Sequence, residues 1–178
     1  MAELGSVEWP PTPIRTERLV LRAPAAQDRA VVIELHASPE VSAFIGGPQP
    51  RDELERLVPL VPRQRPGGFV VEFDGATIGV VSLERRDASY EIRPAAGKVD
   101  LGYLFLPSAW GKGYATEACA ATLRWFADAL PGEPVVLATQ TANEAAVRLA
   151  VRLGFAEVKR LEAYGTEQWF GVWSAARP

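Results

Sequence analysis

The chain has 178 residues, of which 48% are hydrophobic and 23% charged, and its formal net charge is −3. This length and composition are ordinary for one globular domain with its own core and leave little room for a second domain. The small negative charge argues against a nucleic-acid binder and against a membrane-surface binder, since both normally carry a basic excess. We therefore expect neither nucleic acid nor a membrane among the partners of this protein.

The single cysteine and the single histidine bear on the cellular compartment and on metal binding. Cys119 is the only cysteine, so the chain forms no internal disulfide, which fits a reducing compartment. His36 is the only histidine, so we expect no histidine-cluster metal site and no metal cofactor. No apolar run approaches the ~20 residues of a membrane-spanning helix. Residues 1–13 show no signal-peptide pattern, and we expect a cytoplasmic protein.

Two parts of the chain differ in composition. Residues 1–14 contain the run Trp9-Pro-Pro-Thr-Pro13, which is typical of an extended or poorly ordered arm. Residues 15–178 carry regular apolar patterning, with no internal repeat and no low-complexity segment. We expect one domain there, preceded by the arm.

The apolar patterning predicts an alternation of strands and helices. Predicted strands lie at 15–22, 69–73, 77–83, 98–106, 135–139, 156–164 and 168–174. Predicted helices lie at 24–38, 40–45, 52–61, 115–130 and 143–153. The clearest hairpin has Asp74-Gly75 as its turn, because Asp-Gly supplies the positive φ that a tight turn requires. This order predicts a single α/β domain with a mixed central sheet flanked by helices.

A strand, a glycine-containing loop and a helix follow one another over residues 101–118. Gly111 and Gly113 have no Cβ atom, so the backbone can approach an anion closely and adopt positive φ. The first N–H groups of a helix lack partners, and the helix dipole favours negative charge there by ~0.3–1 kcal/mol. Lys112 adds a cationic side chain. The spacing is neither that of a P-loop nor that of a dinucleotide fingerprint, so the loop alone is equally consistent with a turn that binds no ligand.

Three segments in order are more specific than the loop alone. They are Thr16-Glu-Arg-Leu-Val-Leu-Arg22, then Leu101-Gly-Tyr103 through Trp110-Gly-Lys-Gly-Tyr-Ala-Thr-Glu-Ala118, and then Thr141-Ala-Asn143 followed by Leu153-Gly-Phe155. Together they resemble the GNAT superfamily of acetyl-CoA N-acetyltransferases, in the branch that contains the ribosomal-protein N-terminal (alanine/serine) acetyltransferases. The resemblance covers about residues 15–174. It implies a GNAT-like domain whose fourth and fifth strands splay apart.

The resemblance implies acetyl-CoA as cosubstrate and assigns residues to it. The phosphates are expected on the loop and the start of the helix, on Trp110, Gly111, Lys112, Gly113, Tyr114, Ala115 and Thr116. The pantetheine arm is expected to pair like an extra strand with Leu104, Phe105 and Leu106, and an N–H near Leu106 would hold the oxyanion that develops on the thioester carbonyl. Asn143 either contacts the pantetheine or only caps its helix. Arg152 is a candidate for the CoA 3′-phosphate.

The sequence departs from the family pattern where a general acid is expected. Many members place a tyrosine before Leu-Gly-Phe, and this chain has Ala150; Ala146 stands where this branch can carry a serine. A thiol has a pKa of about 8.5, so a CoA thiolate can leave without full protonation, and we expect slower rather than abolished transfer. Ala150 also keeps an alternative open, a non-catalytic acyl-CoA-binding regulatory module.

The second substrate is expected to be a primary amine, either a protein N-terminus or a small-molecule amine, acetylated by direct transfer. An α-amine with a pKa near ~8 is far more often neutral at pH 7.4 than a lysine-like amine near ~10.4, so a site without a strong base suits an α-amine better. Asp100 is the first candidate base, acting directly or through a water, and Glu72 and Glu84 are alternatives. For each of the three, a solvated carboxylate at a strand edge is the other interpretation.

Several further residues have structural and functional interpretations. Cys119 lies on the apolar stripe of the helix at 115–130, which favours core packing over a nucleophile. Glu117 falls in the first turn of that helix, where the dipole favours a carboxylate, and is expected to be structural. Trp169, Phe170 and Trp173 either wall the acceptor cleft or bury a homodimer contact.

Overall fold

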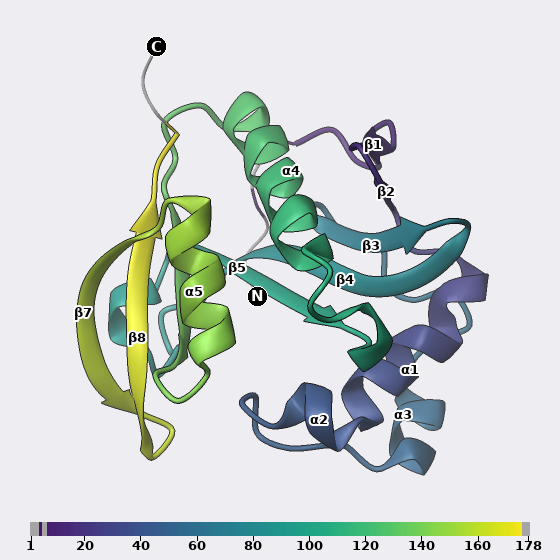
Figure 1. Cartoon of the computed structure of the whole chain (residues 1–178), viewed down its shortest axis with the longest axis horizontal. Coiled ribbons are helices and arrows are strands. Elements are labelled where there is room, and N and C mark those ends of the chain that lie inside the picture. The colour runs from purple at the N-terminus through teal and green to yellow at the C-terminus, as the bar shows by residue number, and fades with distance from the viewer. Residues whose placement is uncertain (1–3, 5–6, 176–178) are drawn as a thin grey trace.

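The computed structural model describes Leu4 and residues 7–175 (Figure 1). Residues 1–3 and 5–6 of the predicted arm, and residues 176–178 of the predicted domain, lie outside the described residues. The strands are β1 Ile14–Arg15, β2 Leu19–Arg22, β3 Gly68–Phe73, β4 Ala76–Arg85, β5 Val99–Phe105, β6 Val135–Gln140, β7 Ala156–Ala163 and β8 Thr166–Trp173. The helices are α1 Arg29–Ala37, α2 Pro39–Ser42, α3 Arg51–Leu57, α4 Tyr114–Ala129 and α5 Glu144–Leu153, with short 3-10 turns η1 Ala26–Asp28, η2 Arg93–Ala95 and η3 Pro107–Ala109.

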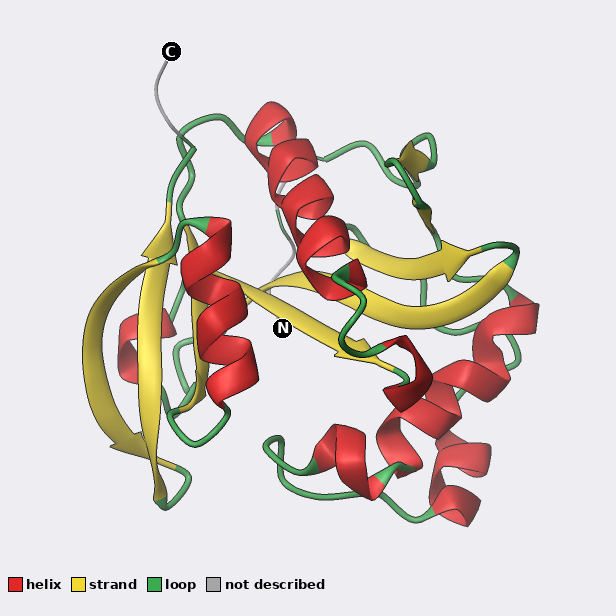
Figure 2. Cartoon of the chain, viewed as in Figure 1, coloured by secondary structure: helices red, strands yellow, loops and turns green. Residues whose placement is uncertain are grey.

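The strands form one mixed sheet in the order β1-β2-β3-β4-β5-β6-β8-β7. Neighbouring strands are antiparallel except β5 and β6, which run parallel. Helices α4 and α5 lie in front of the sheet in Figure 2, and α1, α2 and α3 group at one end of it. The predicted α/β domain with a mixed central sheet and flanking helices is confirmed.

The predicted strand at 15–22 is wrong in one respect, because a tight turn divides it into β1 and β2. The Thr16 N–H donates to the Leu19 carbonyl oxygen at 3.0 Å, and the Leu19 N–H donates to Thr16 Oγ1 at 2.9 Å. A threonine hydroxyl that bonds to nearby backbone competes in this way with a strand ladder. As a result Arg18 lies at the tip of a hairpin that pairs Ile14 with Leu21.

The main core lies between the sheet and α4, and the described part of the N-terminal arm joins it. Leu4 is 3% exposed, and the Trp9 ring packs edge-on against Phe69 and Trp125 at centroid distances of 5.2 and 6.1 Å. The apolar side chains of Leu4 and Trp9 therefore find apolar partners in the core, and the extended or poorly ordered character of the arm stays a prediction. The boundary between arm and domain at residues 14 and 15 stays a prediction.

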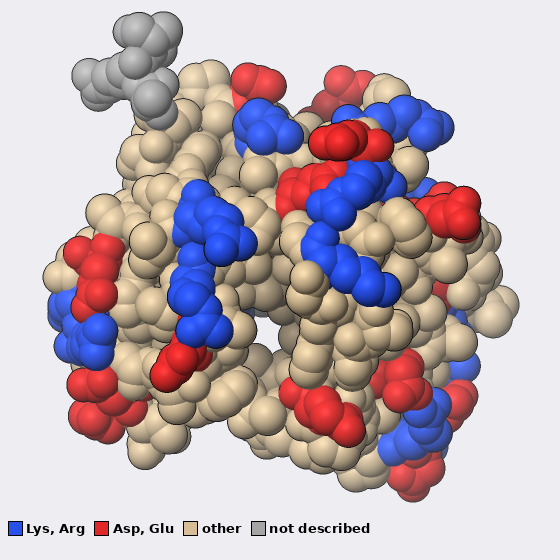
Figure 3. All heavy atoms as spheres, viewed as in Figure 1, with Lys and Arg blue, Asp and Glu red and all other residues tan. Residues whose placement is uncertain are grey.

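Strands β5 and β6 pair at one end only. Val99 pairs with Val135 and Asp100 with Val136, after which β6 continues along β8 as far as Gln140. The predicted splay of the fourth and fifth strands is therefore present. These strands are β5 and β6 in the structure, because the first predicted strand is divided into β1 and β2. Figure 3 shows a deep opening in the surface at this place, between α5 and the part of the molecule that carries β5 and η3.

Candidate functional site

The loop before α4 presents a run of backbone N–H groups. Gly111 and Gly113 have φ values of +72° and +79°, in the left-handed region that glycine adopts without a Cβ clash. The Glu117 N–H donates to the Gly113 carbonyl oxygen at 3.0 Å and is the first amide of α4 with such an acceptor. Among the described residues, the N–H groups of 111–116 donate to no backbone carbonyl. This geometry is that of an anion site at a helix N-terminus.

Trp110 ties this loop to the end of β5. Its indole Nε1 donates to the Phe105 carbonyl oxygen at 2.8 Å, while the side chain remains 49% exposed. The position where the family commonly has glutamine or arginine is thus filled by a side chain that anchors the loop through one directed hydrogen bond.

Arg18 reaches the same loop from the tip of the β1–β2 hairpin. Its Nη1 donates to the Lys112 carbonyl oxygen at 2.9 Å, and its Nε and Nη2 contact Glu117 Oε2 at 2.7 and 2.6 Å. Sequence analysis did not assign Arg18 to the site. The only signal was its place in the first of the three family-like segments, because 94 residues separate it from Lys112.

The backbone of β5 presents its hydrogen-bonding groups alternately to β4 and to the opening. The Leu106 N–H donates to the Ile78 carbonyl oxygen at 2.9 Å, on the β4 side. The backbone N–H and C=O groups of successive residues point to opposite sides of a strand. Leu104 therefore also bonds toward β4, whereas the backbone groups of Tyr103 and Phe105 point toward the space that β6 leaves. The N–H of Leu106 itself is therefore not available to an oxyanion, and of the three residues predicted to pair with pantetheine only Phe105 directs its backbone into the opening.

Asp100 is a buried, ion-paired carboxylate and not a solvated one at a strand edge. It is 4% exposed, and its Oδ2 accepts from Arg86 Nη2 at 2.5 Å and Arg86 Nε at 2.8 Å. Its Oδ1 is buried without a hydrogen-bond partner among the described residues. Burial raises the pKa of Asp100 to about 6, against the opposing effect of the Arg86 charge. Glu84, opposite Asp100 on β4, contacts both Arg65 and Arg86.

The position of Asp100 limits how it can act on a substrate. It lies five residues before Phe105, roughly 17 Å along an extended strand. Leu104 and Asp100 share a face of β5, and Gly102 stands between them. A Cβ atom at Gly102 would meet only Ser82 Oγ, at 3.2 Å, so no bulky side chain fills that interval. This distance excludes direct contact between Asp100 and an amine beside Phe105, and it equally excludes transfer through a single water. Only a chain of several waters could connect the two.

Glu72 belongs to another network. Its Oε2 accepts from Arg22 Nε at 3.0 Å, and Arg22 also contacts the buried Asp28 at 2.8 and 3.0 Å. Strand β3, which carries Glu72, is separated from β5 by β4. Because Glu72 is ion-paired and lies on a strand that is not next to β5, it does not reach the opening between β5 and β6 as a candidate base.

Helix α5 forms the other wall of the opening. Asn143 caps it, since its Oδ1 accepts from the Ala146 N–H at 3.2 Å. Arg152 is exposed in its last turn, and Figure 3 shows basic side chains over α5 beside the opening. Ala150 is fully buried, so α5 offers no hydroxyl group at the position where many GNAT members have tyrosine.

The rim of the opening includes a contact between distant segments. Gln140, the last residue of β6, donates from Nε2 to the Phe44 carbonyl oxygen at 3.1 Å. Phe44 and Ile45 lie between α2 and α3 and are 38% and 55% exposed. The opening is therefore bordered on this side by an apolar segment.

The aromatic residues of β8 are part of the core. Trp169 is 0% exposed and donates from Nε1 to Glu157 Oε2 at 2.7 Å, and Phe170 is 2% exposed in a second apolar cluster with Val136. Trp173 packs against the main core. The homodimer interpretation is wrong for Trp169 and Phe170, because these side chains are covered within their own chain.

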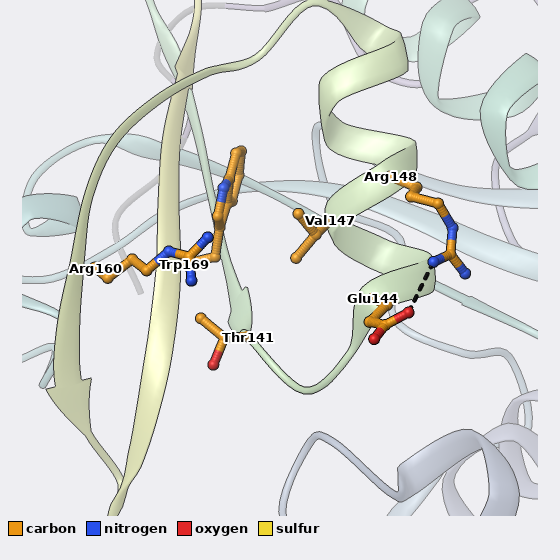
Figure 4. A pocket seen from close by; sticks show the side chains of 6 residues that line it. All are labelled: Thr141, Glu144, Val147, Arg148, Arg160 and Trp169. Carbon is orange, nitrogen blue, oxygen red and sulfur yellow. Dashed lines mark hydrogen bonds and ion pairs between the residues drawn. The ribbon is translucent and has the colours of Figure 1, made fainter.

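Trp169 instead lines a shallow pocket of about 260 Å³ between α5 and β7–β8 (Figure 4). Val147 faces its ring, whereas Arg148 turns away to pair with Glu144 at 3.0 Å. Arg160 crosses from β7 and is paired with Glu157 at 2.9 Å. The charged side chains that line this pocket are thus all ion-paired, and no residue of the loop before α4 is among its lining residues.

Comparison with known proteins decides the family. The model of the acetyltransferase (GNAT) domain matches residues 18–156. The chain belongs to the GNAT family. As a GNAT protein it is an acetyl-CoA-dependent acyltransferase. It is also similar to the uncharacterized N-acetyltransferase YoaA of Bacillus subtilis (strain 168), at 24% identity over 177 residues, covering 93% of this chain and 97% of that one.

Solved GNAT structures share the fold. An acetyltransferase from Bacillus anthracis superposes with a TM-score of 0.72 at 18% identity, over 92% of this chain and 98% of that one. The spermidine N-acetyltransferase from Vibrio cholerae, in complex with CoA and spermine, has a TM-score of 0.68 at 20% identity, over 89% and 96%. The ribosomal L7/L12 α-N-protein acetyltransferase RimL has a TM-score of 0.69 at 14% identity, over 92% and 94%.

Within the described residues, no helix is long and apolar enough to cross a bilayer. The same part of the chain holds no group of three or more His, Cys, Asp or Glu side chains arranged for a metal ion.

Proposed function

We propose that this GNAT enzyme transfers the acetyl group of acetyl-CoA to a primary amine by direct attack within a ternary complex. The observation that carries the proposal is the run of N–H groups at residues 111–116. Within the described part of the chain they lack backbone acceptors, and they follow the end of β5 that no longer pairs with β6. An anionic pyrophosphate on these groups would let an attached extended arm run into the opening along β5.

The donor side uses mostly backbone groups. The pyrophosphate binds the N–H groups from Gly111 to Thr116, with Lys112 as a cationic contact. We assign Arg152 on α5 to the 3′-phosphate. The pantetheine pairs with the outward backbone groups of Tyr103, since the Phe105 carbonyl oxygen already accepts from Trp110 Nε1. The Phe105 N–H, in place of that of Leu106, polarises the thioester carbonyl and holds the developing oxyanion.

The acceptor amine loses its proton to Asp100 through a chain of several waters, since roughly 17 Å of strand separates Asp100 from Phe105. Gly102 and Ser82 leave the interval between Leu104 and Asp100 free of bulky side chains, and the unpartnered Oδ1 of Asp100 supplies the accepting atom. A carboxyl with a pKa of about 6 is mostly ionised at pH 7 and accepts a proton more readily than an ordinary aspartate. The thiolate leaves without a tyrosine acid, because α5 carries Ala150 there.

The acceptor that fits best is an α-amine, as in the ribosomal-protein N-terminal branch, or a small amine with an apolar body. Two carboxylates of the α1–α3 region are already paired, Glu34 with Arg51 and Glu55 with Arg29. The exposed large apolar side chains of that region are Phe44, Ile45, Leu57, Leu60 and Val61. Of these, Phe44 and Ile45 border the opening, and they favour an apolar substituent on the acceptor amine.

A non-catalytic acyl-CoA-binding module is the weaker alternative, since the family and the curated relative are acetyltransferases, and the thiolate can still leave without a tyrosine acid.

We also propose a cytoplasmic location, on the ground that Cys119 has no second cysteine for a disulfide.

The test is a calorimetric titration of the purified protein with acetyl-CoA, with ATP and NAD as controls, followed by thiol-release assays. We expect selective micromolar binding of acetyl-CoA and thiol release with N-terminal peptides. Parallel assays would use spermine and an amine with an apolar side chain. Absence of acetyl-CoA binding would contradict the proposed function, and binding without thiol release from any amine would favour the non-catalytic alternative.

A further inference from the structure

We propose that Arg18 and Glu117 form a clamp that orients the phosphate-binding loop, so that Arg18 is a positioning residue for the phosphate end of CoA. The inference rests on the proposed function, since it assigns the loop to CoA phosphates. It adds a role for the β1–β2 hairpin, which lies at the other end of the sequence from the loop.

The two side chains hold each other through several directed contacts. Glu117 Oε2 accepts from Arg18 Nε at 2.7 Å and lies 2.6 Å from Arg18 Nη2. Glu117 Oε1 accepts from the Arg18 backbone N–H at 3.0 Å and from Thr16 Oγ1 at 2.6 Å. The whole tip of the hairpin is thereby fastened to the first turn of α4. Because these contacts engage both carboxylate oxygens and come from the side chain and the backbone, they fix the relative position of the hairpin tip and α4.

From this fixed position the guanidinium contacts the loop. Arg18 Nη1 donates to the Lys112 carbonyl oxygen at 2.9 Å, and its guanidinium carbon lies 4.7 Å from the centre of the Tyr114 ring. Arg18 Nη2 would be 3.4 Å from a Cβ atom placed on Gly113. The guanidinium therefore lies against three consecutive residues of the loop and helix start.

The contact with Lys112 fixes the direction of the next N–H group. The carbonyl of Lys112 and the N–H of Gly113 belong to one planar trans peptide, in which the two groups point in opposite directions. Because Arg18 holds the carbonyl on its own side, the Gly113 N–H points away from Arg18. Left-handed glycines on both sides of Lys112 would otherwise let this peptide rotate readily.

The clamp acts through geometry and not through the Arg18 charge. Glu117 compensates that charge at contact distance, and its own carboxylate lies in the first turn of α4, close to where an anion would bind. By charge alone, removing the Glu117 carboxylate would tighten the binding of a polyanion, because a repulsion disappears. If the clamp orients the loop, the same change weakens binding.

The experiment compares dissociation constants for CoA and for pantetheine, which lacks the phosphates, by calorimetry on the full chain. The variants are Arg18→Gln, Arg18→Lys and Glu117→Gln. Arg51→Gln is the control for loss of an exposed ion pair, that with Glu34 of α1. Circular dichroism and thermal unfolding verify the fold of each variant.

We expect CoA affinity to fall roughly tenfold in Arg18→Gln, the effect of losing a charged hydrogen bond that shapes a site. Arg18→Lys should lose as much CoA affinity, since a lysine ammonium keeps the charge but lacks the planar arrangement of N–H donors of a guanidinium. Glu117→Gln should also weaken CoA binding, while pantetheine affinity stays constant in every variant and Arg51→Gln matches the unmodified protein.

Three results would overturn the inference alone: tighter CoA binding in Glu117→Gln, full rescue by lysine at position 18, or equal losses for CoA and pantetheine. If Arg18→Gln does not fold, Glu117→Gln decides between geometry and charge. Failure of the unmodified protein to bind CoA would overturn the inference and the proposed function together.

Discussion

The backbone N–H of Leu106 donates to the carbonyl oxygen of Ile78 at 2.9 Å, so β5 remains bonded to β4 beyond the point where β6 has left it. The neighbouring Phe105 consequently directs its N–H to the other side, where no residue of β6 pairs with it. One antiparallel ladder thus decides which amide of β5 faces the opening. The site depends on this register, and substitutions at two glycines of the sheet test how tightly β4 and β5 are packed together.

Gly79→Ala should destabilise the protein, by roughly 1–3 kcal/mol as for an overpacked core. A Cβ atom there would lie 2.6 Å from the Leu104 carbonyl oxygen and 2.6 Å from the Phe105 ring, so the end of β5 must shift. Urea unfolding measures the change. Gly102→Ala is the matched control, because its Cβ would meet only Ser82 Oγ at 3.2 Å. Equal stability of the two variants would contradict a close β4–β5 approach at Gly79.

Gly111→Ala should weaken acetyl-CoA binding more than it weakens the fold. The residue has φ of +72° with no atom within 4 Å of the added Cβ, so the cost of ~1–2 kcal/mol is backbone strain alone. Gly132→Ala carries a similar strain, at φ of +83° and equally open, in the turn after α4. Calorimetry should show unchanged acetyl-CoA affinity for the Gly132 variant only.

Gly113→Pro is the stronger version of the same experiment. Proline fixes φ at about −65°, which is incompatible with the φ of +79° at Gly113. We therefore expect acetyl-CoA binding to be abolished. The residue is exposed, and the protein should remain folded by circular dichroism. Unchanged affinity in this variant would remove the loop from the CoA site.

Asp100→Asn should change the pH dependence of turnover more than the affinity for CoA. With a pKa of about 6, the unmodified carboxylate would give an acidic limb in kcat that rises through that pH and then levels. Asparagine cannot accept the proton, so the limb should disappear and kcat should fall. Persistence of the limb with the same midpoint would assign it to another group, and equal kcat would move the role to Glu84 or bulk water.

The same carboxyl predicts a pH dependence of stability. Burial raises the pKa of Asp100 from 3.8 to about 6, so between these values the native state binds more protons than the unfolded state. Its contribution to the free energy of unfolding is therefore full below the lower value and is lost as pH rises through the higher one. Urea unfolding at several pH values should show this slope in the unmodified protein and a smaller slope in Asp100→Asn.

Cys119 should be inert toward thiol reagents in the native state. Its side chain is 0% exposed, and burial raises the pKa of the thiol far above its ordinary value, so almost no thiolate is present. The rate of reaction with a disulfide reagent would then follow the opening of the core and increase sharply in denaturant. Rapid labelling of the folded protein would contradict the core position.

Much of the fold was predictable because its signals are local. The Asp74–Gly75 turn adopts positive φ at both residues, at 49° and 76°, as an Asp-Gly hairpin requires. Asn143 and Gly154 mark the two ends of α5 through a side-chain cap and a left-handed residue. Gly111 and Gly113 likewise adopt the backbone conformation that their lack of a Cβ atom allows.

Only the tertiary structure decided which of the candidate groups meet. Arg18 and Glu117 are 99 residues apart, and nothing local predicts that the turn at Thr16 carries one onto the helix of the other. The direction of the Leu106 N–H depends on the register of β4, and the burial of Trp169 on the packing of α5 over β8. By itself the sequence determined the order of elements and a loop with free amides, since periodicity and glycine conformation are local properties. Which amide faces the opening, which carboxylate is buried and which arginine holds the loop were decided by contacts between distant segments.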